Sequence, residues 1–316
     1  MEKKGLVISG GGAYGAYGVG TLAALNKDYD LVCGVSTGSL MSPLVALKKW
    51  DILKTAYTSV TQDKIFDSYW YRPNTFKKNG KVNELGILYV LIARIFGWNQ
   101  SILSLGTTNN MRNLIDQFVD AADFLNIKAS GKEVSVATVN LAEIPSTVHH
   151  FSSNDCKFED FKDWMWASAN APLFTSLIQK EWFDKETQKT YMGEWTDGGL
   201  SELFSLDYAL DAGCTEIDVI IHRVKPTFNK QTDMAQDILD NLERCVDAMR
   251  YDIEFSDGRL EKKFSDAAAK GVKITVYWLG RKLGDNSLIF DQATMKSWYD
   301  EGFATAKNQE RIDTYI

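Results

Sequence analysis

Short apolar runs of strand length alternate with longer amphipathic stretches along most of this chain. Several apolar runs are continuous, which is typical of parallel-sheet strands that helices cover on both faces. The predicted strands are Leu6–Ile8, Leu31–Val35, Glu133–Asn140, Ile217–His222 and Val272–Leu279. The predicted helices are Ala13–Leu25, Thr37–Trp50, Met111–Phe124, Phe161–Ala169, Asp233–Phe255 and Asp291–Lys307. This order predicts an α/β fold with a mostly parallel central sheet flanked by helices.

Residues 62–110 break the order of strand and helix. An aromatic-rich run, Phe66–Phe76, is followed by an apolar run, Leu85–Trp98, in which Arg94 is the only charged residue. Two interpretations stay open: a buried helix with an aromatic-packed loop, or a lid or surface that dips into a membrane. Because no repeat, low-complexity tract or linker is visible, we predict a single domain over residues 1–316 with a decorated insertion near 62–110.

Charge and cysteine spacing narrow the possible functions. The net charge is −7 and no cluster of lysine and arginine dominates, which argues against a nucleic-acid-binding protein. The four widely spaced cysteines predict neither a disulfide framework nor a zinc site. No apolar run reaches the roughly 18 residues of a membrane-spanning helix, and Leu6–Ile8 is too short for the core of a signal peptide. We therefore expect a cytoplasmic protein, with any membrane association being peripheral.

A glycine-rich loop, Gly10-Gly-Gly-Ala-Tyr-Gly15, follows the first predicted strand and opens the first predicted helix. Such a loop holds phosphate in a dinucleotide fold, or forms an oxyanion hole for acyl transfer. A dinucleotide site needs an acidic residue after the second strand, whereas Asp28 and Asp30 precede that strand. The oxyanion hole is therefore favoured, and the backbone donors expected in it are those of Gly10, Gly11 and Gly12.

A second motif, Gly34-Val-Ser-Thr-Gly38, ends the second predicted strand and begins a helix. This is the context of a nucleophile elbow, in which two glycines allow a sharp turn around a strained serine. The turn would lift the hydroxyl of Ser36 above the edge of the sheet and bring the N–H group of Thr37 near it. The positive end of the following helix would favour a developing oxyanion at the same place.

The base that would activate Ser36 is less obvious, because the chain has only three histidines. His149 and His150 precede Asp197 and look like ordinary residues at the solvent edge. His222 ends a predicted strand, where sites form in parallel sheets, and is the serious rival as a base. A third glycine-framed motif is Asp197-Gly198-Gly199, although Asp-Gly alone is also a common hairpin turn.

In this order, the three motifs resemble those of the patatin-like phospholipases. The first is similar to that family's oxyanion loop, the second to its nucleophile elbow, and Asp197-Gly198-Gly199 to the motif that carries the aspartate of its Ser-Asp dyad. Ala167–Phe174 and the stretch from Ile289 to Ala304 are similar as well. The resemblance covers most of the chain except residues 62–110.

The resemblance implies a three-layer patatin-like fold and hydrolysis of lipid acyl esters, of the phospholipase A or lysophospholipase kind. It assigns Ser36 as nucleophile and Asp197 as base, without histidine, metal or other cofactor. The motif glycines that support the site are Gly15, Gly34, Gly38, Gly198 and Gly199. One position departs from the family: Tyr14 stands where the loop usually has arginine or lysine, so a positive charge near the substrate is missing from that position.

Three other functions stay open from the sequence. An acyltransferase would use the same dyad with an alcohol in place of water. A catalytically inactive lipid-binding module would keep the fold without the chemistry. A nucleotide-dependent oxidoreductase is the weakest of the three, because the acidic residues are misplaced. We expect a lipid or membrane-surface substrate and no nucleic-acid partner.

Overall fold

The computed structural model describes residues 2–68, 106–172, 175–225, 258–284 and 286–316, and five single residues between 241 and 255. Its helices are η1 (Gly12–Tyr14), α1 (Gly15–Leu25), α2 (Thr37–Ala46), α3 (Trp50–Thr58), α4 (Gln62–Ile65), α6 (Asn109–Phe118), α7 (Ala121–Ala129), α8 (Phe158–Ser168), η2 (Gly198–Leu200), α9 (Leu206–Asp211), α11 (Arg259–Ala269) and α12 (Gln292–Lys307). Its strands are β1 (Lys4–Ile8), β2 (Leu31–Val35), β3 (Asp67–Ser68), β4 (Gly106–Thr107), β5 (Glu133–Asn140), β6 (Thr147–Ser152), β7 (Ile178–Asp184), β8 (Lys189–Asp197), β9 (Glu216–Val224), β10 (Lys273–Leu279) and β11 (Ile312–Tyr315).

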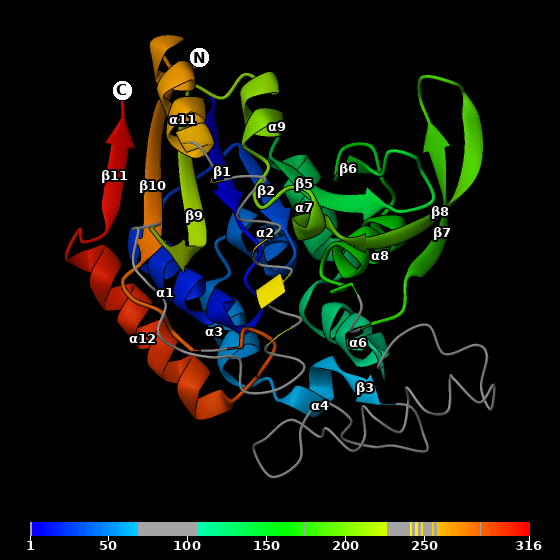
Figure 1. The fold of residues 1–316 in the computed structure, drawn as a ribbon, viewed down its shortest axis with the longest axis horizontal. Helices are drawn as coiled ribbons and strands as arrows, with labels where there is room; N and C mark the ends of the chain where they lie inside the picture. Colours follow the sequence, from blue (N-terminus) through cyan, green and yellow to red (C-terminus); the bar gives the residue numbers. More distant parts are fainter. Residues whose placement is uncertain are drawn as a thin grey trace.

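One large sheet runs through the middle of the structure (Figure 1). Its strands lie in the order β11-β10-β9-β1-β2-β5-β8-β7, and β6 also pairs with β5. The run from β10 to β5 is parallel, whereas β11, β6, β7 and β8 are antiparallel to their neighbours. This mostly parallel sheet confirms the predicted fold class. The carboxyl ends of β10, β9, β1, β2 and β5 lie at one edge, where ligand sites form in such folds.

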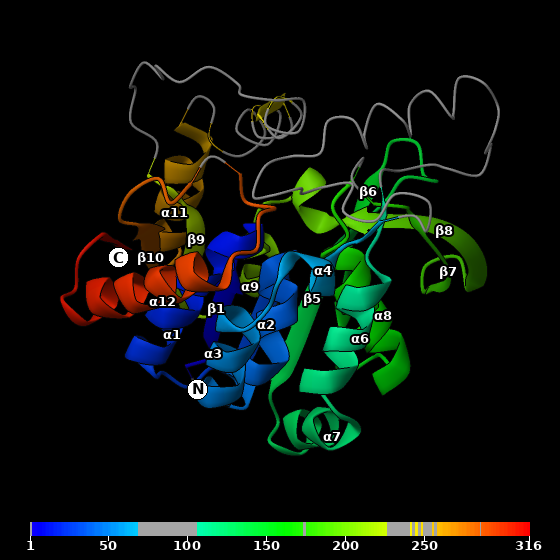
Figure 2. The same ribbon diagram turned by 90° about the horizontal axis from the view of Figure 1, so that it is seen from below.

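Helices cover both faces of the sheet, because successive buried strand residues enter two separate apolar clusters. Leu6 and Ile8 pack in one cluster with residues of α1, α2, α3, α8 and α12, whereas Val7 packs in the other with α9 and α11. Within the first layer, α12 lies alongside α1, as both views show (Figures 1 and 2). The result is three layers, helix on sheet on helix.

The structure agrees with the sequence most closely in the first half of the sheet, where strands Leu31–Val35 and Glu133–Asn140 are confirmed to the residue. The single helix predicted over Thr37–Trp50 is wrong: α2 ends at Ala46 and α3 begins at Trp50. Lys48 between them has a φ of 57°, a left-handed conformation that a continuous helix does not allow. The helix predicted over Met111–Phe124 is likewise divided into α6 and α7.

Several expectations lie outside the described residues. These are most of the helix predicted over Asp233–Phe255, the run Leu85–Trp98, and residues 69–105 of the predicted insertion near 62–110. Within the described part of the chain, no helix is long and apolar enough to cross a membrane.

Candidate active site

The predicted nucleophile elbow is a tight turn between β2 and α2. Ser36 has a φ of 55° and a ψ of −123°, a combination that costs a non-glycine residue about 1–3 kcal/mol. Flanking glycines make the turn possible: a Cβ on Gly34 would lie 2.4 Å from the carbonyl oxygen of Gly38, and one on Gly38 would lie 2.3 Å from that of Ile8. The backbone N–H and hydroxyl of Ser39 both donate to the carbonyl oxygen of Ser36 and hold the turn.

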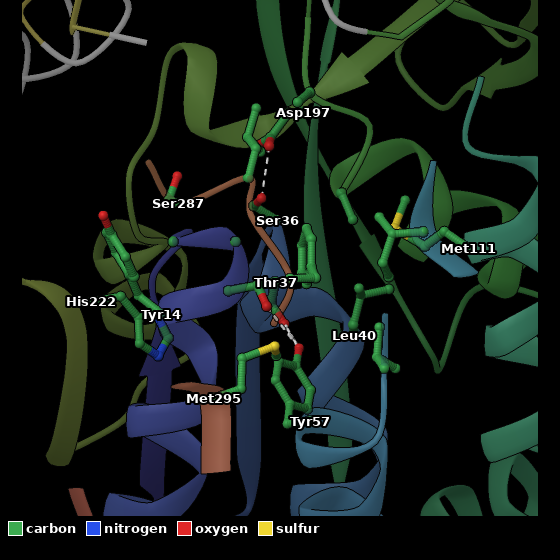
Figure 3. Close-up of a pocket in the computed structure, with 18 of the residues that line it drawn as sticks. Tyr14, Ser36, Thr37, Leu40, Tyr57, Met111, Asp197, His222, Ser287 and Met295 are labelled. Atoms are coloured by element: carbon green, nitrogen blue, oxygen red, sulfur yellow. Dashed lines mark hydrogen bonds between the residues drawn. The ribbon is translucent and has the colours of Figure 1, made fainter. Parts of the chain in front are cut away.

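The elbow directs the hydroxyl of Ser36 at a carboxylate. Ser36 Oγ donates a hydrogen bond of 2.7 Å to Asp197 Oδ2, as Figure 3 shows. The second carboxylate oxygen, Asp197 Oδ1, accepts from the backbone N–H of Gly199 at 2.7 Å, which fixes the plane of the carboxylate. Only 9% of Ser36 and 3% of Asp197 is exposed, so the pair is largely shielded from bulk water.

Strand register explains how residues 161 positions apart meet. On one edge, β5 pairs with β6 from Ser135 to Asn140. On the other edge, β5 pairs with β2 only as far as Ala137, opposite Val35. The next position, Thr138, is paired with Asp197 of β8, so β8 takes the edge that β2 leaves. Asp197 therefore lies directly beyond the end of β2, where Ser36 begins its turn.

The glycine-rich loop lies beside this pair. A Cβ on Gly10 would come within 3.0 Å of Ser36 Cβ, so glycine here lets the loop approach the serine closely. The N–H group of Gly10, expected among the oxyanion donors, instead donates to the carbonyl oxygen of Leu203 at 3.3 Å. Gly11 and Gly12 line the pocket that contains Ser36, and within the described chain their N–H groups have no acceptor. They are the two loop donors left for an oxyanion.

Tyr57 contributes to the elbow, although the sequence analysis gave it no role. Its hydroxyl donates to the carbonyl oxygen of Thr37 at 2.8 Å and lies 2.7 Å from Thr37 Oγ1 (Figure 3). Burial raises the pKa of this phenol well above its usual value, so it stays protonated and remains a donor. Tyr57 thus fixes the residue that follows the serine. Tyr57 and Thr37 lie 20 positions apart, and no motif in the sequence links them.

His222, the rival base, faces away from Ser36. Its Nδ1 lies 2.9 Å from the carbonyl oxygen of Ser9, which makes Nδ1 the protonated nitrogen of a neutral ring. The other nitrogen, Nε2, is buried against α1: a Cβ on Gly18 would lie 2.0 Å from it. Among the described residues Nε2 has no hydrogen-bond partner. Burial lowers the pKa of His222 to about 4, although its bonds to Ser9 and Gly10 act in the opposite direction.

This histidine predicts a specific dependence of stability on pH. Between about pH 6.5 and about pH 4, the unfolded chain binds a proton at His222 that the folded chain excludes. The stability that the neutral His222 contributes is therefore complete above this window. The free energy of unfolding falls by about 3 kcal/mol as the pH decreases through the window. Urea unfolding at several pH values measures this loss. The substitution His222→Asn, whose amide can replace Nδ1, should flatten the curve; an unchanged slope in the variant would contradict this assignment.

Ser36 and Asp197 lie in the wall of a pocket with a volume of about 650 Å³, which is in the range of small-molecule sites. Most of the lining is apolar and comes from α2, α3, α4, α6, the segment before α12 and the first turn of α12. Side chains that line it include Leu40, Leu44, Leu53, Tyr57, Ile65, Met111, Ile115, Phe118 and Met295. Figure 3 shows Leu40, Met111 and Met295 around the same space as Ser36. The arrangement offers a nucleophile next to an apolar chamber.

The remaining motif glycines lie around the same turn. Gly15 begins α1, and Gly198 and Gly199 form η2 directly after Asp197. A Cβ on Gly198 would lie 2.3 Å from the carbonyl oxygen of Ala137, so the chain after Asp197 packs tightly on β5. Within the described residues no group of three or more histidine, cysteine or acidic side chains is arranged to hold a metal ion.

Comparison with known proteins identifies the family of this chain. The sequence model of the family described as patatin-like phospholipase matches residues 6–210, more than half of the chain. No curated protein matches the chain. Among solved structures, the crystal structure of VipD from Legionella pneumophila is similar at 13% sequence identity, with a TM-score of 0.48, over 100% of this chain and 68% of VipD. The family match includes both Ser36 and Asp197. This chain belongs to the patatin-like phospholipase family.

Proposed function

We propose that this protein hydrolyses acyl esters of lipids through a dyad of Ser36 and Asp197, as a phospholipase A or lysophospholipase. The observation that carries the proposal is the 2.7 Å hydrogen bond from Ser36 Oγ to Asp197 Oδ2 in the wall of an apolar pocket. Family membership supports the reaction class. The strained elbow supports the role of Ser36, because a serine is held at such a φ only where the surrounding chain enforces it.

The reaction begins with attack of Ser36 Oγ on the ester carbonyl carbon while its proton passes to Asp197 Oδ2. The carbonyl oxygen becomes an oxyanion, and the N–H groups of Gly11, Gly12 and Thr37 donate to it. One such donor typically lowers the barrier by about 2.7–4 kcal/mol. The tetrahedral intermediate collapses, the C–O bond to the alcohol breaks, and the proton on Asp197 passes to the departing alkoxide.

Water completes the cycle. It attacks the acyl-enzyme carbonyl and gives a proton to Asp197, and the returning electron pair releases the fatty acid from Ser36 Oγ, which takes the proton back. The Gly199 N–H bond to Asp197 Oδ1 keeps Oδ2 directed at the serine in both half-reactions. His222 takes no part in these transfers, because its Nδ1 is bonded to Ser9 and its Nε2 faces α1.

The dependence of activity on acyl length tests this function. For p-nitrophenyl esters in EDTA, kcat/KM is expected to rise about three- to four-fold per added methylene until the apolar chamber is filled, since each buried CH₂ contributes about 0.8 kcal/mol. Ser36→Ala should remove the activity at every length. Ser130→Ala, at an exposed serine that caps α7, is the matched control and should behave as wild type. Activity that survives in Ser36→Ala, or that is indifferent to acyl length, would overturn the proposal.

A further inference from the structure

The end of helix α8 contacts both members of the proposed dyad. Its last residue, Ser168, accepts a hydrogen bond of 3.0 Å at Oγ from the backbone N–H of Ser36. Two positions later, the carbonyl oxygen of Asn170 accepts from the backbone N–H of Asp197 at 3.1 Å. Ser168 is 0% exposed and Asn170 is 1% exposed, so water does not compete for these bonds. One short segment thus holds the backbone of the nucleophile and that of the base at the same time.

These two bonds act on the distance that the chemistry needs. Ser36 follows β2 and Asp197 ends β8, and the two strands pair with β5 at different positions along the same edge. The segment after α8 joins the ends of these strands directly. A shift of either end would lengthen the 2.7 Å hydrogen bond from Ser36 Oγ to Asp197 Oδ2. Displacing reacting groups by about 1 Å can lower a rate by about 100-fold.

The side chain of Asn170 fixes the segment itself. Asn170 Oδ1 accepts from Thr108 Oγ1 at 2.6 Å, and Asn170 Nδ2 donates to the carbonyl oxygen of Ser176 at 2.5 Å. Thr108 Oγ1 in turn accepts from Trp166 Nε1, in the last turn of α8, at 2.9 Å. A buried polar network with paired groups makes the chain that carries it rigid. The carbonyl oxygen that holds Asp197 is therefore fixed in place.

The same segment also contributes to the pocket, but through other residues. Ala169 and Ala171 line the pocket that contains Ser36, whereas Ser168 and Asn170 are absent from its described lining. Alternate positions thus present small apolar side chains to the pocket and polar groups to the backbone of the dyad. A change at Ser168 or Asn170 should therefore affect the dyad more than the binding of substrate.

We propose that Ser168 and Asn170 are positioning residues, which together set the distance between Ser36 and Asp197 from the end of α8. This inference rests on the proposed function, because it takes Ser36 as nucleophile and Asp197 as base. It gives a role to Ala167–Phe174, the stretch that is similar to the family outside the three motifs. Neither positioning residue contacts the reacting atoms in this scheme, so the loss of either lowers kcat and leaves KM nearly unchanged.

The test compares Ser168 with an equivalent serine elsewhere in the chain. Ser168→Ala is expected to lower kcat for p-nitrophenyl esters by about 10- to 100-fold, with KM within about two-fold of wild type. The matched control is Ser153→Ala. Ser153 is equally buried, and its Oγ accepts the backbone N–H of Val134 at the same distance of 3.0 Å, at the opposite end of β5 from Thr138. The two variants should lose similar stability towards urea, but the control should keep the wild-type kcat.

The rate at which a fluorophosphonate probe labels Ser36 gives a second readout. The number of labelled sites also corrects kcat for unfolded molecules. Slower labelling in Ser168→Ala, but not in Ser153→Ala, would support the positioning role even if wild type hydrolysed no ester. Equal kcat and equal labelling rates in these two variants would overturn the positioning role and leave the hydrolase.

A double variant tests whether the two residues act together. Asn170→Ala is expected to lower kcat as Ser168→Ala does, and Asn170→Asp takes its place if the alanine variant does not fold. Because residues that act as a unit have non-additive effects, the double variant should lose less activity than the product of the two single losses. Losses that multiply would mean that Ser168 and Asn170 act separately, and would overturn their shared role.

Discussion

Asp197→Asn is expected to lower kcat for ester hydrolysis by about 10⁴-fold or more, without unfolding the protein. Removing one member of a nucleophile–base unit typically costs 10⁴- to 10⁶-fold. Asparagine has the same shape and can still accept the bond from the Gly199 N–H, so the turn after β8 should persist. Its amide cannot take the proton of Ser36, and the hydroxyl loses its acceptor at 2.7 Å. Turnover of p-nitrophenyl esters, with circular dichroism to verify the fold, measures the effect.

The control for this prediction is His222→Asn. It removes the rival base while keeping a donor near the carbonyl oxygen of Ser9. Activity within about ten-fold of wild type is expected, because no step uses the imidazole. Labelling of Ser36 by a fluorophosphonate probe should persist in this variant and become very slow in Asp197→Asn. A folded His222→Asn that is as inactive as Asp197→Asn would replace the dyad with a Ser-His mechanism.

Gly34→Ala is expected to destabilise the folded state by about 3 kcal/mol or more. The added Cβ would lie 2.4 Å from both the carbonyl oxygen of Gly38 and the hydroxyl oxygen of Ser42, and the backbone carbonyl cannot withdraw without opening the first turn of α2. Overpacking of this kind costs about 1–3 kcal/mol where neighbours can adjust, and more where backbone is in the way. Chemical denaturation of wild type and variant measures the difference.

Gly280→Ala is the matched control. A Cβ at Gly280 would have its nearest contact at 3.5 Å, with Tyr17 Oη, which is an ordinary van der Waals distance. Its N–H bond to that hydroxyl would remain. The control should change the free energy of unfolding by less than about 1 kcal/mol, since alanine also reduces the freedom of the unfolded chain. Equal stability of Gly34→Ala and Gly280→Ala would mean that the elbow is looser than its geometry indicates.

The sequence predicted the parallel core of the fold because those strands are continuous apolar runs of strand length. It did not predict the β7–β8 hairpin, whose strands contain no continuous apolar run and mix exposed polar with aromatic residues. That hairpin brings Asp197 to Ser36. The sequence motifs and their resemblance to a family pointed to both residues. The pairing of β8 with β5, which brings the two together, depends on contacts between segments far apart in the sequence. Nothing in the pattern showed that β8 continues the edge of β5 where β2 stops.

The glycine-rich loop shows a similar limit. The sequence identified it as a source of N–H donors, and glycine content alone treats Gly10, Gly11 and Gly12 as equivalent. They differ because Leu203 occupies the N–H group of Gly10, and that contact joins residues 193 positions apart along the chain. The burial of His222 could not be predicted from the sequence either. Its burial against Gly18 depends on how α1 packs on β9.

The contacts of the segment after β10 have a consequence for how this protein can be divided. The Ala13 N–H and the Tyr14 hydroxyl both donate to this segment, at Ser287 and Gly284, and Gln62 bonds to it at Leu288 and Phe290. A fragment ending at residue 210 would contain all three glycine-framed motifs but none of these contacts. It would also lose β9, leaving the apolar strand β1 as an open edge, which invites aggregation. The stretch that the family model matches, residues 6–210, is therefore a poor choice for an expression fragment.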